Sequence, residues 1–168
     1  QFSISTTMVP IEYEGAEGKI KINLLDTPGY FDFVGEVEEA VSAADAAIIV
    51  VNCKAGIEVG TEKAWDLCEE YKLPRIIFVT NMDDDHASFR ELILKLEKKF
   101  GRKIAPFQVP IRENEKFVGF VNAVKMQGRR FTNLSDYEDC EIPEYTKKNL
   151  GIIRDALIEA VAETSEEY

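Results

Sequence analysis

The sequence predicts an α/β fold in which a mostly parallel sheet carries helices on both faces. Two short, uninterrupted apolar runs, Ala46–Val51 and Ile76–Val79, have the length and composition of strands that are covered on both sides. Between these runs, and again after the second, apolar residues recur at helical spacing. Because strands that alternate with helices form βαβ units, we expect an open parallel sheet whose ligands bind beyond the carboxyl ends of the strands.

The chain before the first apolar run predicts two more strands and a helix. Met8–Tyr13 is strand-like, and Lys19–Leu25 alternates apolar and polar residues with the period of a half-buried strand. The second of these segments leads into Asp26–Gly29 (DTPG), which is a loop sequence. One face of the helix expected after that loop is marked by Phe33, Val37 and Val41.

Two further helices and a strand continue the alternation. The apolar positions of the first helix are Ala64, Trp65, Cys68 and Tyr71, and those of the second are Phe89, Leu92, Ile93, Leu96 and Phe100. A last strand of the parallel pattern is expected at Ile104–Pro110.

The pattern changes after residue 111. Short β-like pieces follow at Phe117–Phe120 and Val121–Met126, divided by Gly119 and Gly128. A final helix has a predicted buried stripe of Leu150, Ile153, Leu157 and Val161. We therefore expect two parts, residues 1–111 and a partial α+β subdomain in residues 112–168.

Composition narrows the functional classes. With 20 Lys and Arg against 31 Asp and Glu, the net charge is −11, which argues against direct nucleic-acid binding by this chain. Three cysteines, Cys53, Cys68 and Cys140, match no zinc spacing and indicate reduced thiols in a cytoplasmic protein. No apolar run approaches the roughly 20 residues of a membrane span, so we expect a soluble protein.

The DTPG loop carries the clearest chemical motif. A carboxylate at a strand tip, here Asp26, can hold Mg²⁺ directly or through water. Gly29, which lacks a Cβ, lets its backbone N–H approach a γ-phosphate. This D-x-x-G arrangement is typical of P-loop NTPases, although the same four residues in isolation can be a turn and nothing more. The strand before the loop and the helix after it favour the functional interpretation.

Nearly the whole chain resembles the GTPase domain of translation elongation factor G, particularly its diverged elongation-factor-G-like bacterial relatives. The resemblance rests on the segment Phe2–Thr7, on the tract Asp26–Trp65 and its distance from the strand end Thr80–Asp83, and on the segment from Glu138 to the end of the chain. It implies a P-loop-NTPase-type fold that binds GTP and Mg²⁺. In that family the last segment belongs to a subdomain inserted into the GTPase fold, which agrees with the change of pattern after residue 111.

The resemblance assigns roles at the Mg²⁺ and γ-phosphate end of the site. Ser3 matches the switch threonine that binds Mg²⁺, Asp26 the Mg²⁺-side aspartate, and Gly29 the glycine whose N–H meets the γ-phosphate. The histidine that positions the attacking water in the family is Tyr30 here. A phenol with a pKa near 10 can orient water but cannot take the protonation roles of an imidazole at neutral pH.

The guanine-binding motif N-K-x-D is also altered. In the register that keeps the family spacing to Phe89, the matching residues are Thr80, Asn81 and Asp83, so only the aspartate is retained. That aspartate would accept hydrogen bonds from the guanine ring N–H and the exocyclic amine. An alternative register, Asn81-x-x-Asp84, keeps the asparagine but loses the spacing to Phe89.

No GxxxxGK(S/T) phosphate-binding sequence occurs in the 168 residues, so we expect a fragment that lacks the P-loop strand and helix and is inactive alone. The full-length protein is expected to bind and hydrolyse GTP on the ribosome during protein synthesis, in the cytoplasm. Within the class, a ribosomal-protection or release-factor relative is a rival. From another class, the rival is a nucleotide-independent ribosome-binding scaffold.

Overall fold

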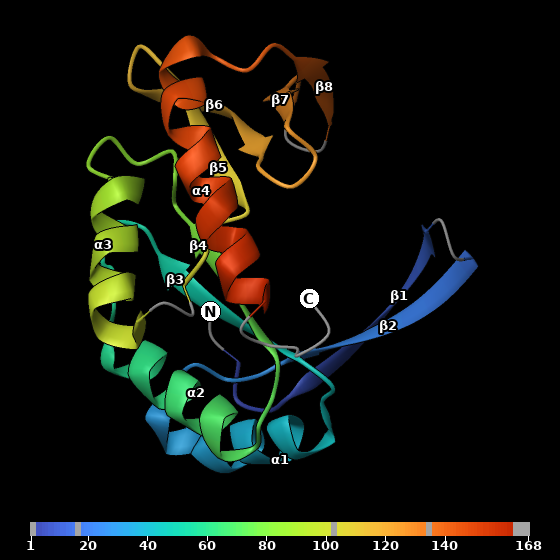
Figure 1. The fold of residues 1–168 in the computed structure, drawn as a ribbon. Helices are drawn as coiled ribbons and strands as arrows, with labels where there is room; N and C mark the ends of the chain where they lie inside the picture. The colour runs from blue at the N-terminus through green and yellow to red at the C-terminus, as the bar shows by residue number, and fades with distance from the viewer. Residues whose placement is uncertain (1–2, 16–17, 102–103, 134–135, 163–168) are drawn as a thin grey trace. The chain divides into compact units, whose positions relative to one another are not determined.

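The fold was analysed on a computed structural model that describes residues 3–15, 18–101, 104–133 and 136–162 (Figure 1). The chain divides into two compact units, which are described separately. The first comprises Gln1–Val51 and Glu58–Phe78, and the second comprises Asn52–Ile57 and Val79–Tyr168. Among the described residues, no helix combines the length and the apolar character that a membrane crossing requires.

An antiparallel hairpin opens the first unit. Strand β1, Thr7–Gly15, pairs with strand β2, Gly18–Asp26, in a continuous register from Thr7 opposite Asp26 to Gly15 opposite Gly18. Both predicted strands are therefore present. The prediction that the second is half-buried is wrong, because Ile20, Ile22 and Leu24 are 39–49% exposed. No other strand of the described chain is hydrogen-bonded to the hairpin, and a sheet of two strands alone buries little of either face.

The two apolar runs form a pair of strands, β3 (Ala47–Asn52) and β4 (Arg75–Thr80). The N–H of Ala47 donates to the Pro74 carbonyl and the N–H of Cys53 to the Thr80 carbonyl. From the first of these bonds to the second, the residue number increases on both strands, so the pair is parallel. The expectation of cover on both sides is wrong. Ile49 and Val51 are buried, whereas the alternate residues Ile48 and Val50 are 59% and 61% exposed.

Two predicted helices lie on either side of β3 in the sequence. Helix α1, Val34–Ala43, follows a 3-10 turn at Phe31–Phe33, and α2 spans Val59–Glu70. A reciprocal cap starts α2, since Glu58 and Thr61 each bond the other's backbone N–H through their side chains. In the same unit Trp65 is buried, and the Arg75 guanidinium stacks 3.9 Å from its ring centre while also pairing with Glu69.

The first helix of the second unit is α3, Phe89–Phe100, as predicted, with Leu92 and Leu96 fully buried. Its four-stranded sheet has the order β5-β6-β7-β8 and is antiparallel throughout. The strands are β5 (Gln108–Glu113), β6 (Lys116–Asn122), β7 (Gln127–Phe131) and β8 (Tyr137–Cys140). Helix α4, Glu144–Ala162, packs Leu150 against Ile111 and Val121 of this sheet and against Ala123 in the turn after β6.

Three sequence expectations for this region are corrected. The last parallel strand, expected at Ile104–Pro110, is β5, which begins at Gln108 and pairs antiparallel with β6. A parallel neighbour would need a long crossover connection, whereas the short turn at Asn114 and Glu115 permits only an antiparallel hairpin. The sheet predicted as mostly parallel is therefore parallel only at β3–β4 among the described strands. Val161, predicted to be buried, is 50% exposed, although Leu150 is fully buried.

Gly119 and Gly128 lie inside β6 and β7 and do not divide strands as the sequence suggested. A Cβ at Gly119 would lie 2.1 Å from the Arg129 carbonyl oxygen, and one at Gly128 would lie 2.7 Å from that of Cys140. The glycines thus allow neighbouring strands to approach closely.

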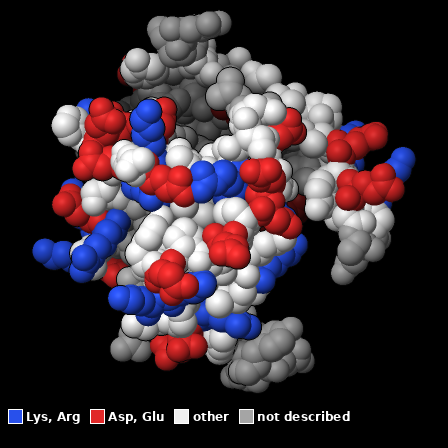
Figure 2. Space-filling model, turned by 90° about the horizontal axis from the view of Figure 1, so that it is seen from above, with Lys and Arg blue, Asp and Glu red and all other residues white. Residues whose placement is uncertain are grey.

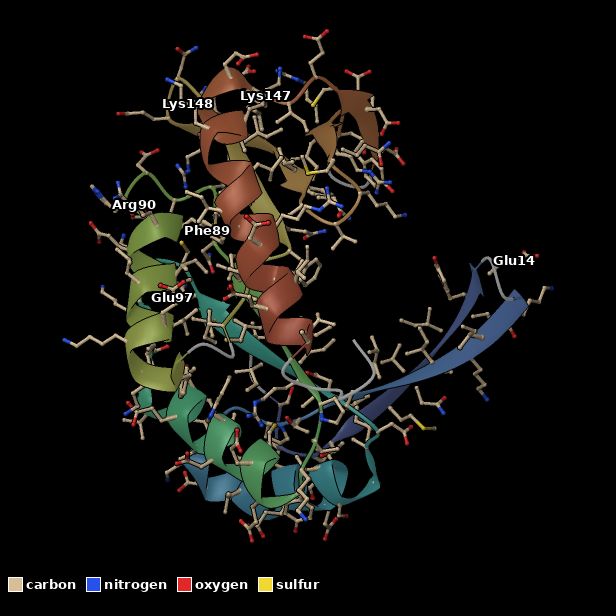
Figure 3. All side chains as sticks on the ribbon, in the orientation of Figure 1. Glu14, Phe89, Arg90, Glu97, Lys147 and Lys148 are labelled. Atoms are coloured by element: carbon tan, nitrogen blue, oxygen red, sulfur yellow. The ribbon has the colours of Figure 1, made fainter. Side chains whose placement is uncertain are left out.

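Charged side chains of both signs are interspersed on the face drawn in Figure 2, and Figure 3 shows Lys147 and Lys148 at the start of α4.

We predict that Gly119→Ala lowers the free energy of unfolding by about 1–3 kcal/mol, because the added methyl group overlaps a backbone oxygen that cannot move alone. Gly151→Ala is the matched control. Gly151 lies in α4 with no atom within 4 Å of the position of a Cβ, so this change should stabilise the helix by about 0.5–1 kcal/mol. Urea denaturation of both variants checks the pair, and equal stabilities would contradict the proposed close approach.

Candidate functional site

The predicted Mg²⁺-side residues come together in the first unit. Asp26 is the last residue of β2 and is exposed, and the Ser3 hydroxyl donates to its Oδ2 across 3.5 Å. Two hard oxygen donors, one of them a carboxylate, fit the preference of Mg²⁺ for few protein ligands with water and phosphate completing the shell. The described residues contain no group of three His, Cys, Asp or Glu side chains for a metal held by protein alone.

Thr6 ties the segment that carries Ser3 to helix α1. Its backbone N–H donates to the Glu36 carboxylate at 2.7 Å, and its hydroxyl donates to the Glu36 carbonyl at 3.1 Å. The segment before β1 therefore has a fixed partner on the helix that follows the DTPG loop. Sequence reasoning missed this contact, because it joins residues 30 positions apart in the chain.

In the loop between β2 and α1, Pro28 is buried, whereas Gly29 and Tyr30 are exposed. No atom lies within 4 Å of the position that a Cβ would take at Gly29, so its backbone is accessible to a bound group. Tyr30 is 57% exposed, and its carbonyl accepts from the Phe33 N–H to start the 3-10 turn. The phenol is thus placed on the surface of the loop that carries the D-x-x-G motif.

The residues predicted to form the altered guanine motif lie at the end of β4 and directly after it, in the second unit. Thr80 is the last residue of the strand, and Asn81 has a left-handed φ of 55°, a conformation that asparagine tolerates better than most residues. The Asn52 side chain, at the end of β3, donates to the Asn81 side-chain oxygen at 3.0 Å and accepts from the N–H groups of Lys54 and Ala55. Asn52 therefore joins the carboxyl ends of the two parallel strands.

Asp83 and Asp84 have different surroundings in the loop. Asp83 is exposed. Asp84 is half-buried, and its two oxygens accept from the His86 backbone N–H at 2.8 Å and from Lys54 Nζ at 3.2 Å. The His86 N–H, and after it Lys54, lower the pKa of the Asp84 carboxyl below its ordinary value. The Asp84 side chain is thus engaged within the loop, while Asp83 faces solvent.

The loop ends at α3. Ser88 caps that helix by accepting from the Glu91 N–H, and Phe89 and Arg90 form its first turn (Figure 3). Sequence reasoning identified the aspartates but missed Asn52, Lys54 and Arg112, which hold this loop. An asparagine directly after a predicted strand was the available signal for Asn52.

Comparison with known proteins now identifies the family. Residues 1–165 match the family described as the elongation factor Tu GTP binding domain. The chain belongs to this family.

One relative, an elongation factor G-like protein of Thermotoga maritima, is 34% identical over 165 residues, which are 98% of this chain and 23% of the relative. A crystal structure of a protein from Thermus thermophilus superposes with a TM-score of 0.89 at 33% identity, covering 99% of this chain and 24% of that one. These findings confirm the resemblance to elongation-factor-G-like GTPases and the P-loop-NTPase type of fold. The chain spans about a quarter of the length of the relatives that it matches.

We predict that Asp84 titrates below the ordinary aspartate range, and that Lys54→Met moves its pKa back toward that range. Because the folded-state pKa is the lower one, the stabilisation is present above the unfolded value of about 4 and is lost as the pH falls through the folded value. Side-chain carboxyl NMR across the acid range measures the titration, and Asp84→Asn should remove this part of the acid dependence. An Asp84 that titrates normally would contradict the contacts described.

Proposed function

We propose that this chain is the nucleotide-binding part of a translation-factor-like GTPase, which binds GTP with Mg²⁺, hydrolyses it, and acts on the ribosome in the cytoplasm. The observation that carries the proposal is the placement of two exposed carboxylates, Asp26 and Asp83, at or just beyond the carboxyl ends of strands in a member of a GTP-binding family. Ligands of open α/β folds bind at such strand ends. Residues 1–111 are proposed as the central part of the GTP-binding domain, and residues 112–168 as the start of its inserted subdomain.

At the phosphate end, Asp26 and Ser3 are the proposed Mg²⁺ ligands, and Gly29 offers its backbone N–H to the γ-phosphate. The bound cation would neutralise charge that develops on the phosphate oxygens during transfer. Tyr30 is proposed to orient the attacking water by a hydrogen bond. Its exposure on the same loop as Gly29 supports this role, since a group that meets water must be reachable from solvent.

At the base end, Asp83 is the proposed acceptor for the guanine N–H groups, with Thr80 and Asn81 beside it. The internal bonds of Asp84 favour this register over Asn81-x-x-Asp84, because both Asp84 oxygens already accept from the loop. Asn81 contributes by holding the loop, since its side-chain oxygen accepts from Asn52. The proposed base recognition therefore depends mainly on Asp83.

A second candidate function is favoured by the altered residues. Tyr30 in place of histidine, with Thr80 and Asn81 in place of asparagine and lysine, would suit a ribosome-binding scaffold that no longer hydrolyses nucleotide. A ribosomal-protection or release-factor relative would share the site. The two predictions below separate an active GTPase from the scaffold.

In the full-length protein, Asp83→Ala is expected to abolish the preference for GTP over ATP, because it removes the only carboxylate proposed to read guanine. Competition binding with the two nucleotides measures the preference. Asp85→Ala is the control, since Asp85 is also exposed and lies in the same loop. A preference that survives Asp83→Ala would contradict the register, and a wild-type protein without preference would favour the scaffold.

For Tyr30, the expectation concerns rate and not affinity. Tyr30→Phe should lower the ribosome-stimulated turnover of the full-length protein by up to about 10²–10⁴-fold, the range for groups that position or transfer protons, with GTP affinity nearly unchanged. Tyr30→His should retain or raise the rate. Single-turnover GTP hydrolysis measures both, and a Tyr30→Phe variant as fast as the wild type would make Tyr30 a packing residue.

A further inference from the structure

Arg112 of β5 contacts the loop that carries Asp83. Its Nη2 donates to the Met82 carbonyl at 2.6 Å and to the Ala87 carbonyl at 3.1 Å, and its Nη1 donates to the Glu115 carbonyl at 2.8 Å. All of these residues belong to the second unit, and Arg112 is half-buried. One guanidinium therefore bridges the start of the loop, its end and the β5–β6 turn.

The two carbonyls lie at the two ends of the loop segment that carries Asp83. The Met82 carbonyl belongs to the peptide group that joins Met82 to Asp83, and Ala87 is the last loop residue before the Ser88 cap. Both Met82 and Ala87 are 8% exposed, so their side chains face the interior while Asp83 faces solvent. Fixing both ends of this short segment fixes the direction in which the Asp83 carboxylate projects.

Arg112 lies at an irregularity of the β5–β6 pairing and is held there by α4. Ile111 pairs with Gly119 and Arg112 with Phe117, so the extra residue of this irregularity, Val118, is on β6. The Tyr145 hydroxyl of α4 accepts from the Arg112 N–H and donates to the Arg112 carbonyl, each at 3.0 Å. Arg112 is thus held on its backbone by α4 and holds the loop with its side chain.

We propose that Arg112 is a positioning residue for purine recognition: it holds the Met82–Ala87 loop in the shape that presents Asp83 to the guanine base. The inference rests on the proposed function. Arginine is suited to this task because its planar fork donates several hydrogen bonds in fixed directions, whereas lysine offers a single point of charge on a flexible stem. Through Tyr145, the position of α4 bears on the same loop.

The first experiment needs no nucleotide and uses the 168-residue chain. Hydrogen exchange is measured at the amides of Asp84 and Ala87, which donate to the Asn81 and Asp84 carbonyls within the loop. Arg112→Met should speed exchange at both amides by about tenfold or more, because losing a charge-assisted hydrogen bond makes the loop easier to open. Arg130→Met is the matched control, because Arg130 pairs with Glu113 in the same sheet, and it should leave the loop amides unchanged. Unchanged loop exchange in Arg112→Met overturns the proposal.

The second experiment measures how strongly the full-length protein prefers GDP to IDP. IDP lacks the exocyclic amine of guanine, from which Asp83 would accept a hydrogen bond. Arg112→Met should lower GDP affinity about ten- to hundredfold and IDP affinity less, so the ratio of the two falls. Arg112→Lys should recover part of the ratio, and Tyr145→Phe should lower it slightly. A general loss of folding would weaken the binding of both nucleotides alike. A ratio of GDP affinity to IDP affinity that stays at the wild-type value therefore overturns the positioning role.

The two experiments distinguish the failure of this inference from the failure of the proposed function. If the wild-type protein binds no guanine nucleotide, the proposed function is wrong, and the exchange measurement still decides whether Arg112 holds the loop. If the wild type binds GDP and the Arg112 and Arg130 variants behave alike, the inference is wrong and the proposed function stands.

Discussion

The Asn52 side chain determines how the chain leaves both parallel strands. Its oxygen accepts from the N–H groups of Lys54 and Ala55, which turns the chain after β3, and its amide donates to Asn81, which has a left-handed conformation. The turn brings the Lys54 ammonium to Asp84, and the Asp84 carboxylate in turn accepts from the His86 N–H. Together these contacts engage the side chains of Asn81 and Asp84, and Asp83 is left facing solvent.

The elements with local signals were predictable from the sequence. The spacing of Leu92 and Leu96 predicted α3, and the apolar runs predicted β3 and β4, because helical period and short aliphatic runs depend only on nearby residues. The direction of β5 was not predictable from the run Ile104–Pro110, because pairing is decided by the next strand and the turn before it. Gly119 was misread as a break for the same reason, since its role is set by Arg129 on the neighbouring strand.

The same difference between local signals and long-range contacts applies to the candidate site. Asp26 was proposed because a carboxylate after a strand is a local pattern, and Asp83 was proposed through the resemblance to the N-K-x-D motif of the family. Arg112 was not identified, because its contact with Met82 joins residues 30 apart, and no local sequence pattern reports such a contact. The altered positions also gain meaning only from the structure. Asn81, the residue predicted to match the lysine of N-K-x-D, has its side chain engaged by Asn52.

The exposed faces of β3 and β4 leave apolar side chains of the isolated chain in contact with water. Ile48, Val50, Ile76 and Phe78 are each more than half exposed, and the β1–β2 hairpin presents further aliphatic side chains along open strand edges. Apolar surface of this kind is removed from water when two copies meet, and open edges add backbone pairing. The concentration of the isolated chain therefore becomes an experimental variable, because association of two copies would remove this apolar surface from water.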